Sequence, residues 1–104
     1  MDTLQRLEAT IAERMTASPE TSYVAKLYSR GTSKIAQKVG EEATEVVIAA
    51  MTGVSDELVG ESADLLFHLL VLLQAQGVSL EDVLAELDRR EGLSGLDEKA
   101  SRNE

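Results

Sequence analysis

Residues 41–73 read EEATEVVIAAMTGVSDELVGESADLLFHLLVLL, with acidic residues on both sides of Gly53 and a nearly continuous apolar run at the end. On either side of Gly53, apolar residues recur at the three- and four-residue spacing of a helix. Glycine commonly ends a helix because it adopts a left-handed conformation without strain. We therefore expect one helix over about residues 32–51, a second over about residues 55–77, and antiparallel packing between them.

Helical patterns also fill most of the remaining chain. A first helix is expected after Asp2, a short one after the cap and proline of Ser18-Pro19, and a last one after Ser79. No alternating β-branched run is present, and the tail from about residue 92 to residue 104 is expected to be irregular. The sequence therefore predicts an all-α fold of four to five helices around a helix hairpin, in a single domain over residues 1–104.

Composition limits the possible functions. The chain has 104 residues, a formal charge of −9 and no cysteine. The absence of cysteine excludes a disulfide scaffold, a thiolate metal site and a cysteine nucleophile, and it fits a reducing compartment. The negative charge argues against binding to nucleic acid or to an anionic membrane through bulk charge. No basic-then-apolar leader opens the sequence, and we expect a cytoplasmic protein.

The run Leu65–Leu73 is apolar on nearly every side of its helix. It is too short to span a membrane, and His68 interrupts it. A helix that is apolar all round must be covered all round, which the few other helices of a chain this small can hardly achieve. We therefore expect a helical-bundle homodimer in which a second subunit completes the cover. A central core helix in a monomer is the alternative.

The negative charge is concentrated in one segment. Residues 41–88 hold eleven acidic and no basic residues, whereas residues 1–40 carry a net charge of +2. In the hairpin, Glu45 and Glu61 each lie eight residues from Gly53, and Glu42 and Asp64 each lie eleven. Antiparallel packing would place Glu45 opposite Glu61 and Glu42 opposite Asp64, about 12–17 Å from the turn, in a register that could slip by one helical turn.

Converging carboxylates without basic partners repel one another, so a cation is expected to offset the repulsion. Ligation by oxygen alone suits Mg²⁺ first and Mn²⁺ second. Zinc would require histidine or cysteine, a di-iron site would require Glu-x-x-His, and the pattern of a calcium-binding loop is absent. The alternative is a solvated acidic helix face. The candidate metal ligands are Glu42, Glu45, Glu61 and Asp64.

Basic residues precede the acids on the same helix face. Lys34 and Lys38 are spaced at four residues and lead to Glu42, and Lys26 and Arg30 add charge just upstream. Since Mg²⁺ sites typically join carboxylates to substrate phosphates, these lysines are candidate phosphate ligands. Ordinary ion pairing one turn apart is the alternative for each of them. For His68, a hydrogen-bonded histidine in the core or an interface is the preferred interpretation.

Four segments together resemble one known family. They are SYVAKL at residues 22–27, KIAQKVGEEATE at 34–45, ESADLLFHLLVLL at 61–73, and the tail from RREGLSG to EKASR at 89–102. The chain resembles the phosphoribosyl-ATP pyrophosphatases of histidine biosynthesis, within the MazG-like all-α nucleotide pyrophosphohydrolases. The resemblance implies Mg²⁺-dependent hydrolysis of 1-(5-phosphoribosyl)-ATP to 1-(5-phosphoribosyl)-AMP and pyrophosphate by a homodimer, without a nucleic-acid or membrane partner.

Within that resemblance, the candidate residues take on roles. The four metal-ligand candidates would hold the ion, and Glu41 is the candidate general base, with a pKa that like-charged neighbours could raise. Lys26, Lys34 and Lys38 would bind phosphate oxygens. A second group could close over the substrate, although interaction with the dipole at a helix C-terminus, together with a solvated tail, is the preferred interpretation of Arg89, Arg90 and Lys99.

Two other functions remain open from the sequence. The same metal-binding frame could serve a housecleaning pyrophosphohydrolase that acts on canonical or damaged (d)NTPs. Alternatively, the chain could be a non-enzymatic helical dimerisation module whose acids form a solvated face. Substrate assays distinguish hydrolysis of phosphoribosyl-ATP from hydrolysis of (d)NTPs, and a Mg²⁺ titration tests whether the chain is only a dimerisation module.

Overall fold

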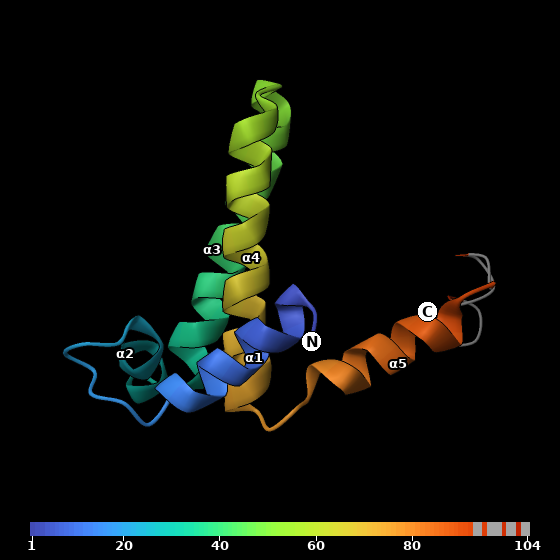
Figure 1. Ribbon diagram of the computed structural model, residues 1–104. Coiled ribbons are helices and arrows are strands. Elements are labelled where there is room, and N and C mark those ends of the chain that lie inside the picture. Colours follow the sequence, from blue (N-terminus) through green and yellow to red (C-terminus); the bar gives the residue numbers. More distant parts are fainter. Residues whose placement is uncertain (93–94, 96–98, 100–101, 103–104) are drawn as a thin grey trace.

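The computed structural model describes residues 1–92, 95, 99 and 102, and five helices form in this part of the chain. The prediction of an all-α fold is confirmed. Figure 1 shows two short helices at the base of the molecule, a long helix pair that rises from it, and a last helix that projects to one side. The helices are α1 (Thr3–Arg14), α2 (Tyr23–Ser29), α3 (Thr32–Thr52), α4 (Ser55–Ala75) and α5 (Leu80–Arg90).

Side-chain caps explain where several of these helices begin. The Asp2 carboxylate accepts from the backbone N–H of Gln5, and the Gln5 side chain accepts from the N–H of Asp2. Ser79 caps α5 in the same manner by accepting from the N–H of Asp82. At the tip of the hairpin, Gly53 ends α3 with φ of 76°, a conformation that glycine adopts without a steric penalty. The predicted hairpin turn is confirmed.

The predicted start of α2 is wrong. Ser18-Pro19 does not open the helix, because the Ser18 carbonyl accepts from the N–H groups of Thr21 and Ser22 and closes a separate turn. Ser22 caps α2 instead, and its hydroxyl accepts from the N–H of Ala25. The irregular tail expected from residue 92 falls mainly outside the described residues.

The hydrophobic core lies at the base, where α1 and α2 pack against the start of α3 and the end of α4. Ile11, Ile35 and Val71 are its most fully buried large side chains, and Val24, Leu27, Leu70 and Leu80 complete it. A long-range hydrogen bond supports this packing, since the Glu8 carboxylate accepts from the N–H of Leu80 at 2.7 Å. The first helix therefore holds the start of α5 in place.

The upper part of the α3–α4 hairpin, residues 42–66, extends beyond the base as an arm (Figure 1). Its apolar side chains are largely uncovered, with 58% of Ile48, 82% of Met51 and 69% of Val59 exposed. The radius of gyration is 15.8 Å, whereas a compact chain of this length has about 13 Å. The arm therefore has an apolar surface that its own chain does not cover.

Helix α4 is long and apolar enough to cross a membrane by length and composition, a test that the core helix of a soluble protein also passes.

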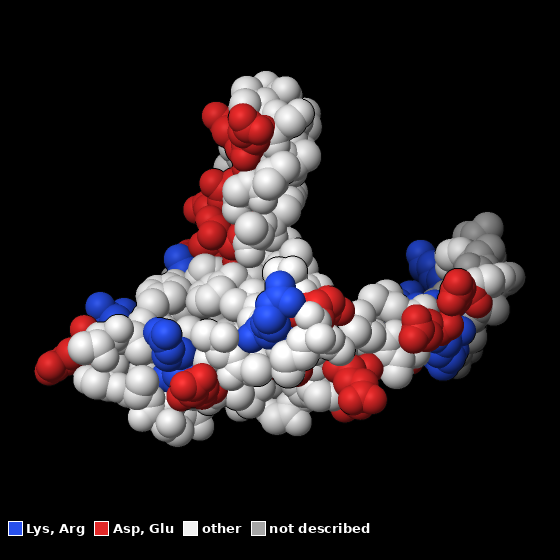
Figure 2. Space-filling view, in the orientation of Figure 1, with Lys and Arg blue, Asp and Glu red and all other residues white. Residues whose placement is uncertain are grey.

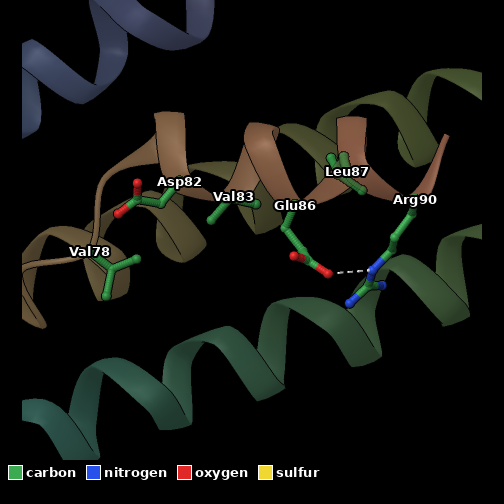
Figure 3. Close-up of a pocket in the computed structure, with 6 residues that line it drawn as sticks. All are labelled: Val78, Asp82, Val83, Glu86, Leu87 and Arg90. Carbon is green, nitrogen blue, oxygen red and sulfur yellow. Dashed lines mark hydrogen bonds and ion pairs between the residues drawn. The ribbon is translucent and has the colours of Figure 1, made fainter. Parts of the chain in front are cut away.

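Helix α5 carries a second uncovered apolar surface. Val78, Val83 and Leu87 line a cavity of about 300 Å³ on this helix, together with Asp82, Glu86 and Arg90 (Figure 3). The exposed fraction of Leu87 is 56%. The arm and α5 thus share the property that each presents apolar side chains away from the core.

Candidate active site

Three of the predicted metal ligands meet on the arm. Glu42, Glu45 and Glu61 each offer a carboxylate oxygen, and these oxygens lie within 4.8 Å of one another. Glu42 and Glu45 come from α3 and Glu61 from α4, so the predicted pairing of Glu45 with Glu61 across the hairpin is confirmed. Figure 2 shows acidic side chains gathered along one edge of the arm. We refer to these three residues as the acidic cluster.

The chemistry of the acidic cluster fits a hard divalent cation. Glu42 Oε2 and Glu61 Oε2 are buried, and neither has a hydrogen-bond partner among the described residues. Burial raises the pKa of Glu42, and its contact with Glu45 raises it further. Buried carboxylate oxygens normally have partners, because leaving them unpaired is unfavourable. A cation ligated by oxygen alone would satisfy these atoms and offset the repulsion among the carboxylates.

Asp64, the fourth predicted ligand, is not a member of the acidic cluster. It follows Glu61 by three residues on α4, and its side chain is exposed. Its carboxylate lies close enough to Tyr23 to raise the pKa of that phenol. The assignment of Asp64 as a metal ligand therefore stays a prediction.

The pKa of Glu41 shifts in the direction opposite to the one expected. The side-chain amide of Gln37 donates to its carboxylate at 2.9 Å, and the Lys38 ammonium lies 3.4 Å away. These two neighbours lower the pKa of Glu41, the amide having the larger effect. The expectation of a raised pKa is wrong because Glu41 faces an amide and a cation rather than other carboxylates. Its role as general base stays a prediction.

The three predicted phosphate ligands share one cavity of about 240 Å³. Besides Lys26, Lys34 and Lys38, its lining contains Tyr23, Leu27, Arg30 and Glu41. Lys38 also reaches the acidic cluster, since its ammonium lies 3.6 Å from a Glu42 oxygen. The ion pairing that was the alternative interpretation of Lys38 is therefore present. This residue connects the basic cavity to the acidic cluster.

His68 is a buried, hydrogen-bonded histidine, as predicted. Only 6% of it is exposed, and its Nδ1 lies 2.8 Å from the backbone carbonyl oxygen of Asp64. Its Nε2 lies 2.8 Å from the Tyr23 hydroxyl. Phe67 stacks on the Tyr23 ring with a centroid distance of 6.2 Å. Helix α4 thereby holds the side chain at the start of α2 by both a hydrogen bond and aromatic packing.

The remaining predicted substrate ligands do not reach this site within one chain. Arg89 and Arg90 lie in the last turn of α5, which projects away from the arm (Figure 1). Both pair with Glu86, at 2.6 Å and 3.1 Å, and they lower the pKa of Glu86 to about 2. Lys99 is exposed. The position of the two arginines in the last turn of α5 agrees with the preferred interpretation, in which they face the helix dipole, whereas their ion pairs with Glu86 were not predicted.

Two further charged residues line the site and were not among the predicted ligands. Glu57 lines a cavity of about 140 Å³ with Glu45 and Glu61, and Arg30 lines the basic cavity. The spacing of Glu57 contained a signal, because it precedes Glu61 by four residues on α4 and residues on one helix face recur at this spacing. Arg30 was noted only as upstream charge, and it caps the end of α2, so helix periodicity does not relate it to Lys34 of α3.

In this all-α chain, three carboxylates lie beside a basic cavity. Such an arrangement is suited to binding phosphates together with a divalent cation. Residues 4–91 match the family model described as phosphoribosyl-ATP pyrophosphohydrolase. The chain belongs to the phosphoribosyl-ATP pyrophosphohydrolase family. The predicted family is confirmed.

Named relatives cover almost the whole chain. A phosphoribosyl-ATP pyrophosphatase of Erythrobacter litoralis is 73% identical over 104 residues, which is all of both chains. The protein of the same name from Novosphingobium aromaticivorans is 66% identical over 100 residues, 96% of this chain and 94% of the relative. That of Zymomonas mobilis is 58% identical over 101 residues, 97% of this chain and 94% of the relative.

Proposed function

We propose that this chain hydrolyses 1-(5-phosphoribosyl)-ATP to 1-(5-phosphoribosyl)-AMP and pyrophosphate, the second step of histidine biosynthesis. In this reaction water adds to the α-phosphorus, the bond from that phosphorus to the α–β bridging oxygen breaks, and pyrophosphate leaves. The observation that carries the proposal is the position of Lys38, which lines the basic cavity and pairs with Glu42 of the acidic cluster. A triphosphate could therefore contact lysines and a carboxylate-held cation together.

The proposed cofactor is Mg²⁺, with Mn²⁺ as a possible substitute. Glu42, Glu45 and Glu61 would hold it, and Asp64 is the proposed fourth ligand. A bound Mg²⁺ neutralises triphosphate charge and makes a coordinated water more acidic. The support for this assignment is the pair of buried carboxylate oxygens that have no partner in the described part of the chain.

The other residues act on the phosphates and on the attacking water. Lys26, Lys34 and Lys38 would bind nonbridging phosphate oxygens and stabilise the charge that develops on the leaving pyrophosphate. Glu41 lines the same cavity and stays the proposed general base, although its lowered pKa makes it a weaker base than an ordinary glutamate. Arg89, Arg90 and Lys99 would approach a substrate only if the last helix packed against another subunit.

The functional unit in this proposal is a homodimer in the cytoplasm. The apolar residues of the arm and of α5 support it, because monomeric proteins rarely leave such surfaces uncovered. We propose a second copy of the chain as the partner that covers the arm, since apolar side chains of both α3 and α4 are exposed there. The phosphoribosyl-ATP substrate is the proposed ligand, and no nucleic-acid or membrane partner is proposed.

A pyrophosphate-release assay with purified protein tests the proposal. Phosphoribosyl-ATP and a panel of canonical and damaged dNTPs are compared with Mg²⁺, with Mn²⁺ and with EDTA. We expect turnover of phosphoribosyl-ATP that requires the divalent cation. Turnover of dNTPs alone would instead support a housecleaning enzyme. Failure to turn over any nucleotide, together with failure to bind Mg²⁺, would support a dimerisation module.

A further inference from the structure

Tyr23 occupies the border between the two halves of the site. It begins α2, lines the basic cavity with Lys38, and contacts α4 through His68. About half of the residue is exposed, although its hydroxyl forms a hydrogen bond to a buried partner. Tyr23 therefore bonds to a protein partner through its hydroxyl and also lines the basic cavity.

The hydrogen bonds of His68 decide what this hydroxyl can offer. A backbone carbonyl oxygen only accepts, so His68 Nδ1 must donate to the Asp64 oxygen. In the neutral imidazole, Nε2 is then the acceptor, and the Tyr23 hydroxyl donates its proton to it. The phenol oxygen then has only acceptor lone pairs left. It cannot donate to a phosphate oxygen, which is itself an acceptor, but it can accept a hydrogen bond from an ammonium group.

Lys38 lines the same cavity as Tyr23, and its charge acts on the phenol. Its ion pairs with Glu41 and Glu42, at 3.4 Å and 3.6 Å, are longer than a well-formed charged hydrogen bond. Burial raises the pKa of Tyr23, and Lys38 is close enough to lower it in part. Any cation that Glu42 binds would compete with Lys38 for the same carboxylate. Lys38 would then keep its contact with Glu41, and the Tyr23 oxygen is a further acceptor in the same cavity.

We propose that Tyr23 is a positioning residue that holds the Lys38 ammonium in the basic cavity. His68 gives Tyr23 this role by accepting a hydrogen bond from the phenol hydroxyl, which leaves the phenol oxygen free to accept from Lys38. The proposal rests on the assignment of Lys38 to phosphate binding made above. It concerns how that lysine is placed, and it predicts that the effect of Tyr23 on turnover passes through Lys38.

A double-mutant cycle tests this dependence. Tyr23→Phe retains the ring that stacks on Phe67 and removes the oxygen, while Tyr28→Phe is the matched control, an exposed tyrosine on the same helix. We expect Tyr23→Phe to lower kcat/KM about tenfold in the wild-type background and less than about twofold in Lys38→Met. An equal loss in both backgrounds, or no loss in either, would overturn the proposal. Melting temperatures identify any part of the loss that comes from unfolding.

A second readout needs neither turnover nor metal. The side-chain ¹³Cε–¹⁵Nζ signals of the lysines are recorded in EDTA for the wild type, Tyr23→Phe and Tyr28→Phe. We expect the Lys38 signal to move in Tyr23→Phe alone, with the Lys34 signal unchanged. An unchanged Lys38 signal would contradict the positioning role, even if phosphoribosyl-ATP is the substrate. If the wild type does not hydrolyse that substrate, the proposed function fails and the spectra still decide the role of Tyr23.

Discussion

The base and the arm of this protein are built from the same two long helices, yet they differ in how completely they are covered. At the base, Ile35 of α3 and Val71 of α4 are almost inaccessible to solvent. On the arm, Ile48 and Val59 of the same two helices are mostly exposed. The acidic cluster also lies on the arm, so the proposed chemistry occurs where the single chain is least complete.

Helix length explains the difference. α3 and α4 have 21 residues each and are therefore about 31 Å long, whereas α1 has 12 residues and α2 has 7. The short helices can cover only the lower part of the long pair. In the proposed dimer a second copy of the chain covers the arm, and in the proposed metal site a cation supplies the counter-charge for its acids. The following experiments test this comparison, from the largest expected effect to the smallest.

The largest effect is expected from removal of charge in the acidic cluster. Glu45→Gln or Glu61→Gln should lower pyrophosphate release from phosphoribosyl-ATP about a thousandfold, which corresponds to about 4 kcal/mol of transition-state stabilisation. In EDTA, the melting temperature should stay the same or rise, because repulsion among the carboxylates is relieved. Glu13→Gln, an exposed site on α1, is the control for activity. A large loss of stability would show that the acids are structural.

The second effect concerns the core of the base. Ile11→Ala should lower the free energy of unfolding by about 3 kcal/mol, because it removes buried methyl groups and leaves a cavity. Urea unfolding followed by circular dichroism measures this loss. A loss below about 1 kcal/mol would mean that the base is loosely packed, and the contrast with the arm would disappear.

The same type of truncation on the arm should affect association instead. Ile48→Ala is expected to shift the monomer–dimer equilibrium toward monomer in analytical ultracentrifugation, since this side chain is uncovered within its own chain. At concentrations where both proteins are monomeric, the loss in unfolding free energy should be below about 0.5 kcal/mol. A wild-type protein that sediments as a monomer at all concentrations would contradict the proposed dimer.

A smaller effect is expected from the basic cavity. Lys34→Gln should raise the KM for phosphoribosyl-ATP about tenfold, because one charge-assisted contact to phosphate is lost. The affinity for Mg²⁺ measured by calorimetry should hardly change, since Lys34 belongs to the basic cavity and not to the acidic cluster. A matched loss of Mg²⁺ affinity would show that the two halves of the site do not act separately.

The smallest effect is expected on α5. The contacts of Arg89 and Arg90 lower the pKa of Glu86 to about 2, so their stabilising effect is present above the ordinary glutamate pKa and is lost as the pH falls toward 2. Glu86→Gln should lower the melting temperature at pH 7 by less than about 3 °C, because the pairs are exposed. The difference from the wild type should disappear near pH 2. Asp88→Asn, exposed on the same helix, is the matched control.

The sequence was sufficient for features that depend on local patterns. The hairpin turn at Gly53, the caps at Asp2 and Ser79, and the pairing of Glu45 with Glu61 all follow from short-range spacing, and the structure confirms them. The family was also recognisable from its motifs, and the homodimer stays a prediction.

Features that depend on tertiary neighbours were harder to predict. The start of α2 was placed wrongly because Ser18-Pro19 and Ser22 both have capping chemistry, and only the backbone contacts of Ser18 distinguish them. The lowered pKa of Glu41 depends on which neighbours its side chain meets. The Tyr23–His68 bond joins residues 45 positions apart, a contact that no local spacing announces.

The bond from Glu8 to the backbone of Leu80 has a consequence for the order in which the chain folds. Its two partners are 72 residues apart, whereas Glu45 and Glu61 are separated by only 16. Closing a short loop loses less conformational entropy than closing a long one. Helices α3 and α4 can therefore pack together while later residues are still being synthesised. The bond from Glu8 to Leu80 must wait until residue 80 has left the ribosome, whereas α1 and α2 can already contact each other. The contact that holds the start of α5 is therefore among the last that the growing chain can make.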